Sequence, residues 1–229
     1  MILSSLIPSP SCIICGKTKD RICPECKRFL KAHEDICPLC HHYSPNGKVC
    51  PDCQIKYSPY FEGVSIVFKA TPPIRKLLIK LKYKHQKDIS RFFAKFLLLE
   101  IQRNPFLKNK NLGITFVPSH RVKTIFKRWY SQSYRLAYHL ANTMWQKPIK
   151  VCEKAKNTVS QLTLNKYQRE KNVLGAFRPV QVVSLKKLDY LILIDDILTT
   201  GATLQEVSKC IKNTYPYLKI WGVVVWRYA

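Results

Sequence analysis

The most informative part of this chain reads Leu191-Ile192-Leu193-Ile194-Asp195-Asp196-Ile197-Leu198-Thr199-Thr200-Gly201-Ala202-Thr203. Its first four residues are apolar without a break, which is typical of a strand buried in a parallel sheet. Neighbouring residues on a strand point to opposite faces, so Asp195 and Asp196 can serve one ligand only if the chain is already leaving the sheet there. The small, hydroxyl-rich run that follows supplies this exit and leads into a helical pattern at Val207, Cys210 and Ile211.

The free backbone N–H groups of such a helix N-terminus favour an anion. Two carboxylates beside it suit a ligand that carries a diol at one end and a phosphate at the other, which describes a ribose 5-phosphate. The stretch closely resembles the motif with which type I phosphoribosyltransferases bind phosphoribosyl pyrophosphate (PRPP). In that motif two acidic residues hold the ribose hydroxyls and the loop amides hold the 5′-phosphate, which implies PRPP-binding roles for Asp195, Asp196 and residues 199–203. The alternative is a capped helix after a core strand, with the acids acting only as caps.

Length and composition predict a globular α/β protein. A chain of 229 residues with 46% apolar content can hold one full α/β domain and a small module. No apolar run is long enough to span a bilayer, and the first sixteen residues contain no Lys or Arg, unlike a secretory signal. We therefore expect a cytoplasmic protein.

The formal net charge of +25 predicts a polyanionic partner or an anionic membrane surface. Two zinc ions, each held by four thiolates, would bring the working charge to about +21, because each site adds about −2. Much of the excess is lysine, which genome-wide composition also produces, so charge alone does not identify nucleic acid as the partner.

Eight of the ten cysteines form four C-x-x-C pairs before residue 54. In a reducing compartment such pairs bring thiolates onto a tetrahedral ion, so four of them predict two structural zinc sites that hold together a module too small to have its own core. The predicted ligands are Cys12, Cys15, Cys23, Cys26, Cys37, Cys40, Cys50 and Cys53.

The arrangement of these ligands stays open. The gaps between pairs suit two ribbons in series, although a cross-braced pairing of alternate C-x-x-C turns is also possible. Redox-active dithiols and an iron–sulfur site are rival interpretations. His33, His41 and His42 are further candidate ligands, and we expect them not to bind metal.

The remaining pattern alternates between strands and helices. After a short linker at Lys56 to Pro59, Phe61 to Lys69 has the β-branched and aromatic content of a strand. Amphipathic helices are predicted from Pro72 onward and from Ile89 to Ile101. Two further core strands are predicted at 113–118, which ends at a proline, and at 220–226.

A basic and aromatic segment follows the strand at 113–118. Cations interleaved with aromatic side chains are what single-stranded nucleic acid requires, because the phosphates take the charge and every base offers a face for stacking. The candidate DNA-binding residues are Lys76 and Lys80 on the first helix, then Arg121, Lys123, Lys127, Arg128, Trp129 and Tyr130, with Tyr134 as a further stacking candidate. The alternative is that Trp129 and Tyr134 belong to the core of the next helix.

The polar stretch 154–177 lies between core strands, and a short helix is expected to begin at Thr163 or Asn165. A polar segment in that position is a candidate hood over an active site.

Taken together, these features resemble the ComF family over nearly the whole chain. That family combines a double zinc ribbon, a basic helix, a Val-Pro strand end, an Arg-Gly-Phe-Asn-Gln element, a Thr-x-x-Gln…Arg-x-x-Asn-Val-x-Gly-Ala-Phe hood, the PRPP motif and a terminal arginine. The corresponding positions here are Lys82 in the helix, Val117, Pro118, Arg128, Gln132, Thr158, Gln161, Arg169, Asn172, Val173, Gly175, Ala176, Phe177 and Arg227. The Arg-Gly-Phe-Asn-Gln element departs, reading Arg128-Trp129-Tyr130-Ser131-Gln132.

The resemblance implies an α/β fold: a double zinc ribbon over residues 1–57 and a phosphoribosyltransferase-like domain over 58–229, with a mostly parallel central sheet flanked by helices. It implies pyrophosphate or hood contacts from Val117, Pro118, Lys82, Arg128, Thr158, Gln161, Arg169 and Asn172. It also implies a competence factor that handles incoming single-stranded DNA at the cytoplasmic side of the inner membrane. The expected cofactors are two structural Zn²⁺ and Mg²⁺ with PRPP. The expected partners are single-stranded DNA, PRPP or a related ribose phosphate, an anionic membrane surface, and other DNA-uptake or recombination proteins. The alternative function is an active phosphoribosyltransferase acting on an unidentified nucleobase or amine.

Overall fold

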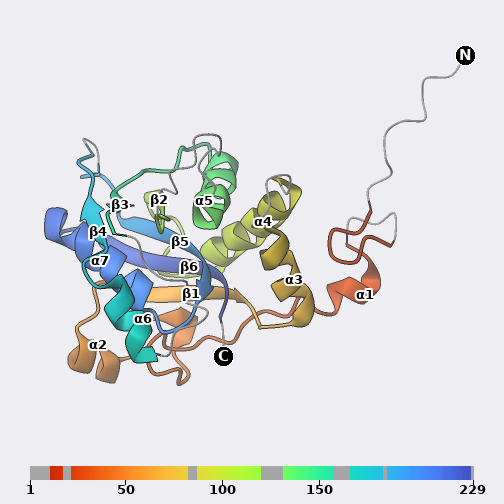
Figure 1. Ribbon diagram of the computed structural model, residues 1–229, viewed down its shortest axis with the longest axis horizontal. Coiled ribbons are helices and arrows are strands. Elements are labelled where there is room, and N and C mark those ends of the chain that lie inside the picture. Colours follow the sequence, from red (N-terminus) through yellow and green to blue (C-terminus); the bar gives the residue numbers. More distant parts are fainter. Residues whose placement is uncertain are drawn as a thin grey trace, which may run out of the picture.

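A parallel four-stranded sheet forms the centre of the protein (Figure 1). The computed structural model describes residues 11–17, 22–81, 87–119, 131–156, 166–182 and 185–227. Within them the strand order is β1-β6-β5-β2, and a separate antiparallel pair joins β3 and β4. The strands are β1 (Gly63–Phe68), β2 (Leu112–Phe116), β3 (Cys152–Lys154), β4 (Phe177–Pro179), β5 (Tyr190–Leu198) and β6 (Lys219–Arg227).

The two inner strands, β5 and β6, are covered on both faces. Ile192 and Ile194 point into a cluster with α3 (Pro72–Leu81), α4 (Lys87–Arg103) and α5 (Gln132–Thr143). Leu191 and Leu193 point into a second cluster, to which α7 (Ala202–Thr214) and the β3–β4 pair contribute. This burial on both faces explains why β5 begins with an unbroken apolar run instead of an alternating pattern.

The N-terminal part of the chain packs along β1, an edge strand of the sheet. It contains α1 (Pro24–Lys27), the short helix η1 (Pro45–Gly47) and α2 (Pro51–Tyr57). Isolated bridges join Ala32 to Phe68 and Lys48 to Gly63, so each end of β1 is met by a different piece of the cysteine-rich segment. These contacts cover backbone groups that an edge strand would otherwise leave unpaired.

The predicted fold class is confirmed: the chain is mixed α/β, with a parallel sheet and two cysteine tetrads near the N-terminus. The predicted strands and both amphipathic helices are present, with boundaries that differ by a few residues from the prediction. Helix α2 ends at Tyr57, close to the expected domain boundary, and the division into 1–57 and 58–229 stays a prediction. Among the described helices, none is sufficiently long and apolar to cross a membrane.

Candidate functional site

The site begins where β2 stops and β5 continues. The β2–β5 ladder ends at Phe116 and Ile194, with a last hydrogen bond from the Val117 N–H to the Ile194 carbonyl (3.0 Å). Pro118 has no N–H and does not extend the strand. The expectation that the chain leaves the sheet at the acidic pair is wrong, because β5 remains paired with β6 as far as Leu198. The open side of β5 left by the end of β2 begins at Asp195.

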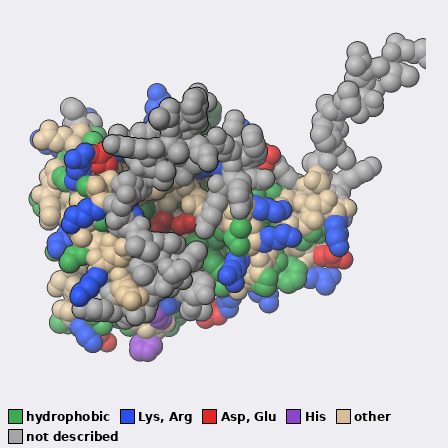
Figure 2. Space-filling model, in the orientation of Figure 1, with side chains coloured by type: hydrophobic (Ala, Val, Ile, Leu, Met, Phe, Trp, Pro, Cys, Tyr) green, Lys and Arg blue, Asp and Glu red, His purple; other side chains and the backbone are tan. Residues whose placement is uncertain are grey.

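Asp195 is a buried carboxyl group at this open edge. Its side chain is 9% exposed, and Oδ1 accepts hydrogen bonds from the Ser133 hydroxyl (2.8 Å) and the Asp196 N–H (2.9 Å). Burial and then the neighbouring charge of Asp196 raise the pKa of Asp195 well above its ordinary value. Figure 2 shows acidic side chains recessed near the middle of the face drawn there, in the region of β5 and β6.

Lys154, at the end of β3, lies within electrostatic reach of this carboxyl group. Burial lowers the pKa of Lys154, while the charge of Asp195 acts in the opposite direction. Asp196 is half-buried beside them. The edge therefore combines a buried acid, a second acid and a desolvated amine, which are groups that can recognise hydroxyls and phosphate.

The loop after β5 turns sharply into α7. Gly201 is the N-cap residue and has a φ of 78°, a left-handed conformation in which a side chain is strained. The Ala202 N–H reaches the Thr200 hydroxyl at 3.4 Å, and Thr199 and Thr203 are half-buried beside it. A 13-residue helix that starts at this turn presents its N-terminal backbone groups at the same sheet edge as Asp195.

Within the part of the chain that the structure describes, two buried donors near this edge have no hydrogen-bond acceptor. They are Gln132 Nε2, at the first position of α5, and Arg227 Nε, at the end of β6. Arg227 on β6 pairs with Leu198, the last residue of β5, and Thr199 follows Leu198 in the chain. Burial lowers the pKa of the Arg227 guanidinium group. Buried donors without partners are uncommon in folded proteins, and a ligand phosphate would satisfy them.

The cysteines assemble into two tetrads. Cys12, Cys15, Cys23 and Cys26 form the first, and Cys37, Cys40, Cys50 and Cys53 form the second. Within each tetrad the sulfur atoms lie within 4.8 Å of one another. Consecutive C-x-x-C pairs therefore share a site, and the cross-braced alternative is excluded. The candidate ligands His33, His41 and His42 belong to neither tetrad.

The tetrads fit a tetrahedral metal ion. The Cys15–Cys23 and Cys40–Cys50 sulfur pairs are 3.8 and 3.6 Å apart. Zinc–sulfur bonds of about 2.3 Å in a tetrahedron place sulfur atoms about 3.8 Å apart. Burial alone would raise the pKa of Cys12, but backbone N–H groups outweigh it and lower this pKa to about 6. Each site can thus hold one metal ion, and an all-sulfur tetrahedron is a ligand set that zinc favours.

Comparison with known proteins gives three informative relatives. Competence protein F of Haemophilus influenzae is 26% identical over 216 residues, which cover 90% of each chain. DNA utilization protein YhgH of Escherichia coli is 26% identical over 212 residues, or 87% of this chain and 88% of the relative. Competence protein ComFC of Streptococcus pneumoniae is 24% identical over 223 residues, or 88% and 93%. No protein-family model matches the chain.

The resemblance to the ComF family is confirmed. Several residues of the ComF pattern lie outside the described residues: Lys82, Arg128, Thr158 and Gln161. The same holds for Arg121, Lys123, Lys127, Trp129 and Tyr130, and for the predicted helix start at Thr163 or Asn165. Lys76 is exposed and Lys80 half-buried on α3. The PRPP, hood and DNA roles of all these residues stay predictions.

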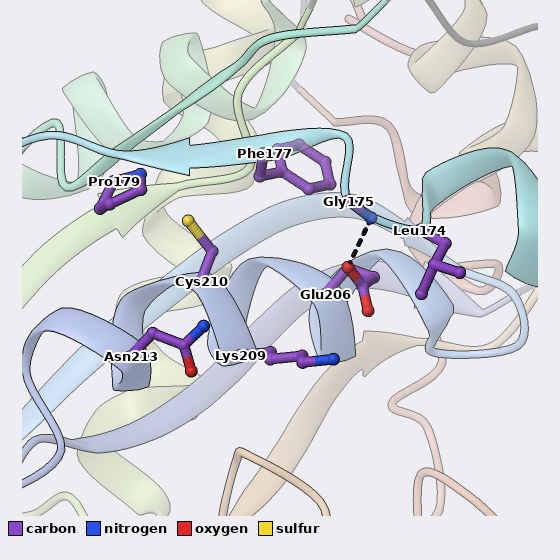
Figure 3. Close-up of a pocket in the computed structure, with 8 residues that line it drawn as sticks. All are labelled: Leu174, Gly175, Phe177, Pro179, Glu206, Lys209, Cys210 and Asn213. Atoms are coloured by element: carbon purple, nitrogen blue, oxygen red, sulfur yellow. Dashed lines mark hydrogen bonds between the residues drawn. The ribbon is translucent and has the colours of Figure 1, made fainter.

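The described part of the ComF-like hood consists of α6 (Lys166–Val173) and the turn into β4. Arg169 belongs to α6, and Asn172 is half-buried near its end. The Gly175 N–H donates to Glu206 Oε2 on α7 (3.0 Å), which fastens the turn to the helix that starts after Gly201. Figure 3 shows this bond at the side of a groove of about 410 Å³, lined by Leu174, Gly175, Phe177, Pro179, Glu206, Lys209, Cys210 and Asn213.

The groove lies on the flank of α7 and is lined by neither Asp195 nor Asp196. It therefore differs from the edge predicted to bind PRPP. The residue that sequence reasoning missed is Ser133, which is buried and contacts Asp195 from 62 positions away. No local spacing links these two residues. The only sequence signal for Ser133 is its place next to Gln132 in the ComF pattern.

Proposed function

We propose that this protein is a competence factor that handles incoming single-stranded DNA at the cytoplasmic side of the inner membrane and carries a pocket for PRPP or a related ribose phosphate. The proposed competence role rests on the similarity, over about nine-tenths of both chains, to a protein named Competence protein F. Relatives named DNA utilization protein support a role in handling DNA.

The charge of the chain supports DNA as a direct ligand. A net charge of +25 favours phosphate backbones of any sequence, because neutralising them releases counterions. The aromatic residues interleaved with the cations of 121–134 favour single strands, whose bases are free to stack. The same charge gives affinity for an anionic inner-membrane surface and for complexes of other DNA-uptake or recombination proteins with DNA.

The sheet edge supports the ribose-phosphate pocket. The Asp195 and Asp196 carboxylates would accept the ribose hydroxyls, and the Gly201 turn with the α7 N-terminus would hold the 5′-phosphate. Gln132 and Arg227 offer unsatisfied donors for further phosphate oxygens. Mg²⁺ commonly binds through one or two carboxylates together with substrate phosphates, which matches this combination. Two Zn²⁺ ions in the cysteine tetrads complete the proposed cofactors.

The second candidate function is phosphoribosyl transfer, favoured by the orphaned donors of Gln132 and Arg227. An amine or nucleobase nitrogen would form a bond to the anomeric carbon as the bond from that carbon to pyrophosphate breaks. The electron pair leaves with the pyrophosphate, the attacking nitrogen releases its proton to solvent, and fixed donors stabilise the developing charge. Release of pyrophosphate from PRPP in the presence of nucleobase or amine acceptors tests this function directly.

The double variant Asp195→Asn plus Asp196→Asn distinguishes the role of the pocket from that of the DNA-binding surface, and it keeps the side-chain volumes. We expect the variant to lose the rise in unfolding temperature that PRPP and Mg²⁺ give the wild type, because a ligand stabilises only a fold that it binds. Its affinity for single-stranded DNA should be unchanged or higher, since two negative charges are gone. Fluorescence anisotropy with labelled oligonucleotides measures the second quantity.

Transformation frequency in a competent host then decides whether the pocket matters. A folded double variant that binds DNA but does not support transformation would show that the pocket is required. Normal transformation without PRPP binding would reject both the enzymatic and the regulatory use of the pocket. A wild-type protein with equal affinity for single and double strands at every salt concentration would reject stacking.

A further inference from the structure

Trp145 has an unusual combination of exposure and backbone strain. Its side chain is 97% exposed, and its φ is 56°, in the left-handed region. It follows the C-cap residue of α5, Met144, in a turn closed by hydrogen bonds from the Trp145 N–H to the Asn142 carbonyl and from the Gln146 N–H to the Ala141 carbonyl. Glycine is the residue favoured at this position of such a turn. A large aromatic residue that is strained and buries almost nothing does not stabilise the fold, so a function is the better explanation.

Two more exposed aromatic side chains lie one turn apart on α5. Tyr134 is 38% and Tyr138 42% exposed, and their ring centroids are 6.2 Å apart. Tyr134 and Tyr138 are separated by one helical turn, and Trp145 lies two residues beyond Thr143, the last residue of α5. The residues Leu136, Ala137, Leu140 and Ala141 face the core instead. The helix lies beside α4 (Figure 1).

We propose that Tyr134, Tyr138 and Trp145 form a stacking face for the bases of single-stranded DNA, hereafter the α5 aromatic face. This inference deepens the proposed function and rests on it. Tyr134 and Tyr138 present flat surfaces one helical turn apart, and Trp145 adds a third ring just beyond the end of the helix, so that more than one base can stack. Stacking of bases on aromatic side chains tolerates any sequence, as the uptake of arbitrary DNA requires.

The surroundings of the face favour DNA over other occupants. The exposed neighbours Asn142 and Thr143 are polar, and exposed Lys147 follows Trp145 by two residues. No aliphatic side chain of α5 is among the exposed large apolar residues of the described chain. The apolar face of a membrane-surface helix is continuous, whereas polar Asn142 and Thr143 are exposed beside these rings. At its N-terminal end the face directly follows the basic segment 121–130 in the chain.

The face also begins next to the acidic edge. Ser133, which donates to Asp195, immediately precedes Tyr134, and the Tyr134 ring meets the edge of Phe116 at the end of β2 (5.0 Å between centroids). DNA on this face would thus pass the candidate ribose-phosphate pocket. Helix α5 thus contributes both to the α5 aromatic face and, through Ser133, to the candidate ribose-phosphate pocket.

The test is the variant Trp145→Gly. Glycine relieves the left-handed strain, so we expect the unfolding temperature to stay the same or rise. We also expect the affinity for a labelled poly-dT oligonucleotide to fall about tenfold, which is typical of the loss of one stacking residue. Duplex affinity should be unchanged, because phosphate contacts do not use the ring. Tyr138→Ala should weaken single-strand binding in the same way.

Tyr43→Ala is the matched control, because Tyr43 is 76% exposed but lies in the cysteine-rich segment, outside the face. Its single-strand affinity should equal that of the wild type. Normal poly-dT affinity of Trp145→Gly, in a protein whose wild type prefers single strands, would overturn the α5 aromatic face and leave the proposed function intact. A wild type that binds no single-stranded DNA would overturn both. Loss of binding to phosphatidylglycerol vesicles without loss of poly-dT binding would mark the face as a membrane surface and also overturn the proposal.

Discussion

At the scale of single residues, Asp195 shows a conflict between stability and ligand binding. Its carboxyl group is buried and keeps two hydrogen bonds, from Ser133 and from the Asp196 N–H. Both hydrogen bonds are accepted by Oδ1 and favour the charged form of Asp195. Burial and the charge of Asp196 outweigh them and raise the pKa of Asp195. The fold therefore favours a protonated Asp195, and the ionised form is the one that a ribose diol or Mg²⁺ would use.

Replacing Asp195 with Asn tests this conflict through the pH dependence of stability. The carboxyl group of the unfolded chain ionises near pH 4, and that of the folded chain at higher pH. Stability contributed by the protonated form is thus complete below about pH 4 and is lost as the pH rises towards the folded value. We expect Asp195→Asn to unfold at a higher temperature than the wild type at pH 7 and to show no such gain at pH 4.

Thermal unfolding across pH 4 to 8 measures the difference. A wild type and an Asp195→Asn variant that differ by the same amount at every pH would mean that Asp195 does not titrate differently in the folded and unfolded chain.

At the scale of elements, the sequence predicts the parts whose signal is local. Unbroken or alternating apolar runs locate β1, β2, β5 and β6, and the Thr-Thr-Gly-Ala-Thr run locates the turn into α7. The extension of β5 beyond Asp195 was missed, because the ladder with β6 holds polar residues in the sheet regardless of their strand propensity. The three-residue strands β3 and β4 are too short to show a period, and the contact between Ser133 and Asp195 depends on packing alone. Long-range pairing of this kind leaves no pattern in neighbouring residues.

The turn at Gly201 allows a prediction for the β5–α7 connection. A Cβ at this position would meet no atom closer than Leu39 Cδ2, at 3.9 Å, so the effect of a side chain is backbone strain and not a clash. We expect Gly201→Ala to lower the free energy of unfolding by about 1–2 kcal/mol. Gly201→Asn should lose less, because Asn adopts the left-handed conformation more readily. Urea unfolding of both variants gives the comparison, and equal losses would rule out strain as the cause.

At the scale of the whole molecule, the two cysteine tetrads support different sides of the sheet. Cys12, Cys23 and Cys26 belong to the buried cluster of α3, α4 and α5. Cys37 and Cys53 belong to the cluster on the α7 side, where Leu39, which lies between Cys37 and Cys40 in the sequence, packs next to Gly201. The Tyr60 N–H, just after α2, also donates to Gln205 on α7 (3.2 Å). The second tetrad is therefore the one that lies on the side of the Gly201 turn and α7.

This asymmetry gives different expectations for the loss of each metal ion. We expect a zinc content near two per chain by elemental analysis, falling to about one in Cys12→Ser plus Cys15→Ser and also in Cys37→Ser plus Cys40→Ser. Only the second pair of substitutions should abolish the rise in unfolding temperature given by PRPP and Mg²⁺, because only that tetrad packs against the Gly201 turn.

Circular dichroism at low temperature provides the control, since each double variant must keep its helical signal for the comparison to count. Zinc near zero in the intact wild type would refute the structural-metal interpretation, and zinc near one would mean that one tetrad is idle. Loss of the PRPP response in both variants would show that the first tetrad also supports the loop, through the sheet itself. A response retained in both would show that Gly201 and α7 hold their geometry without the metal ions, so that the turn before α7 would be independent of the cysteine tetrads.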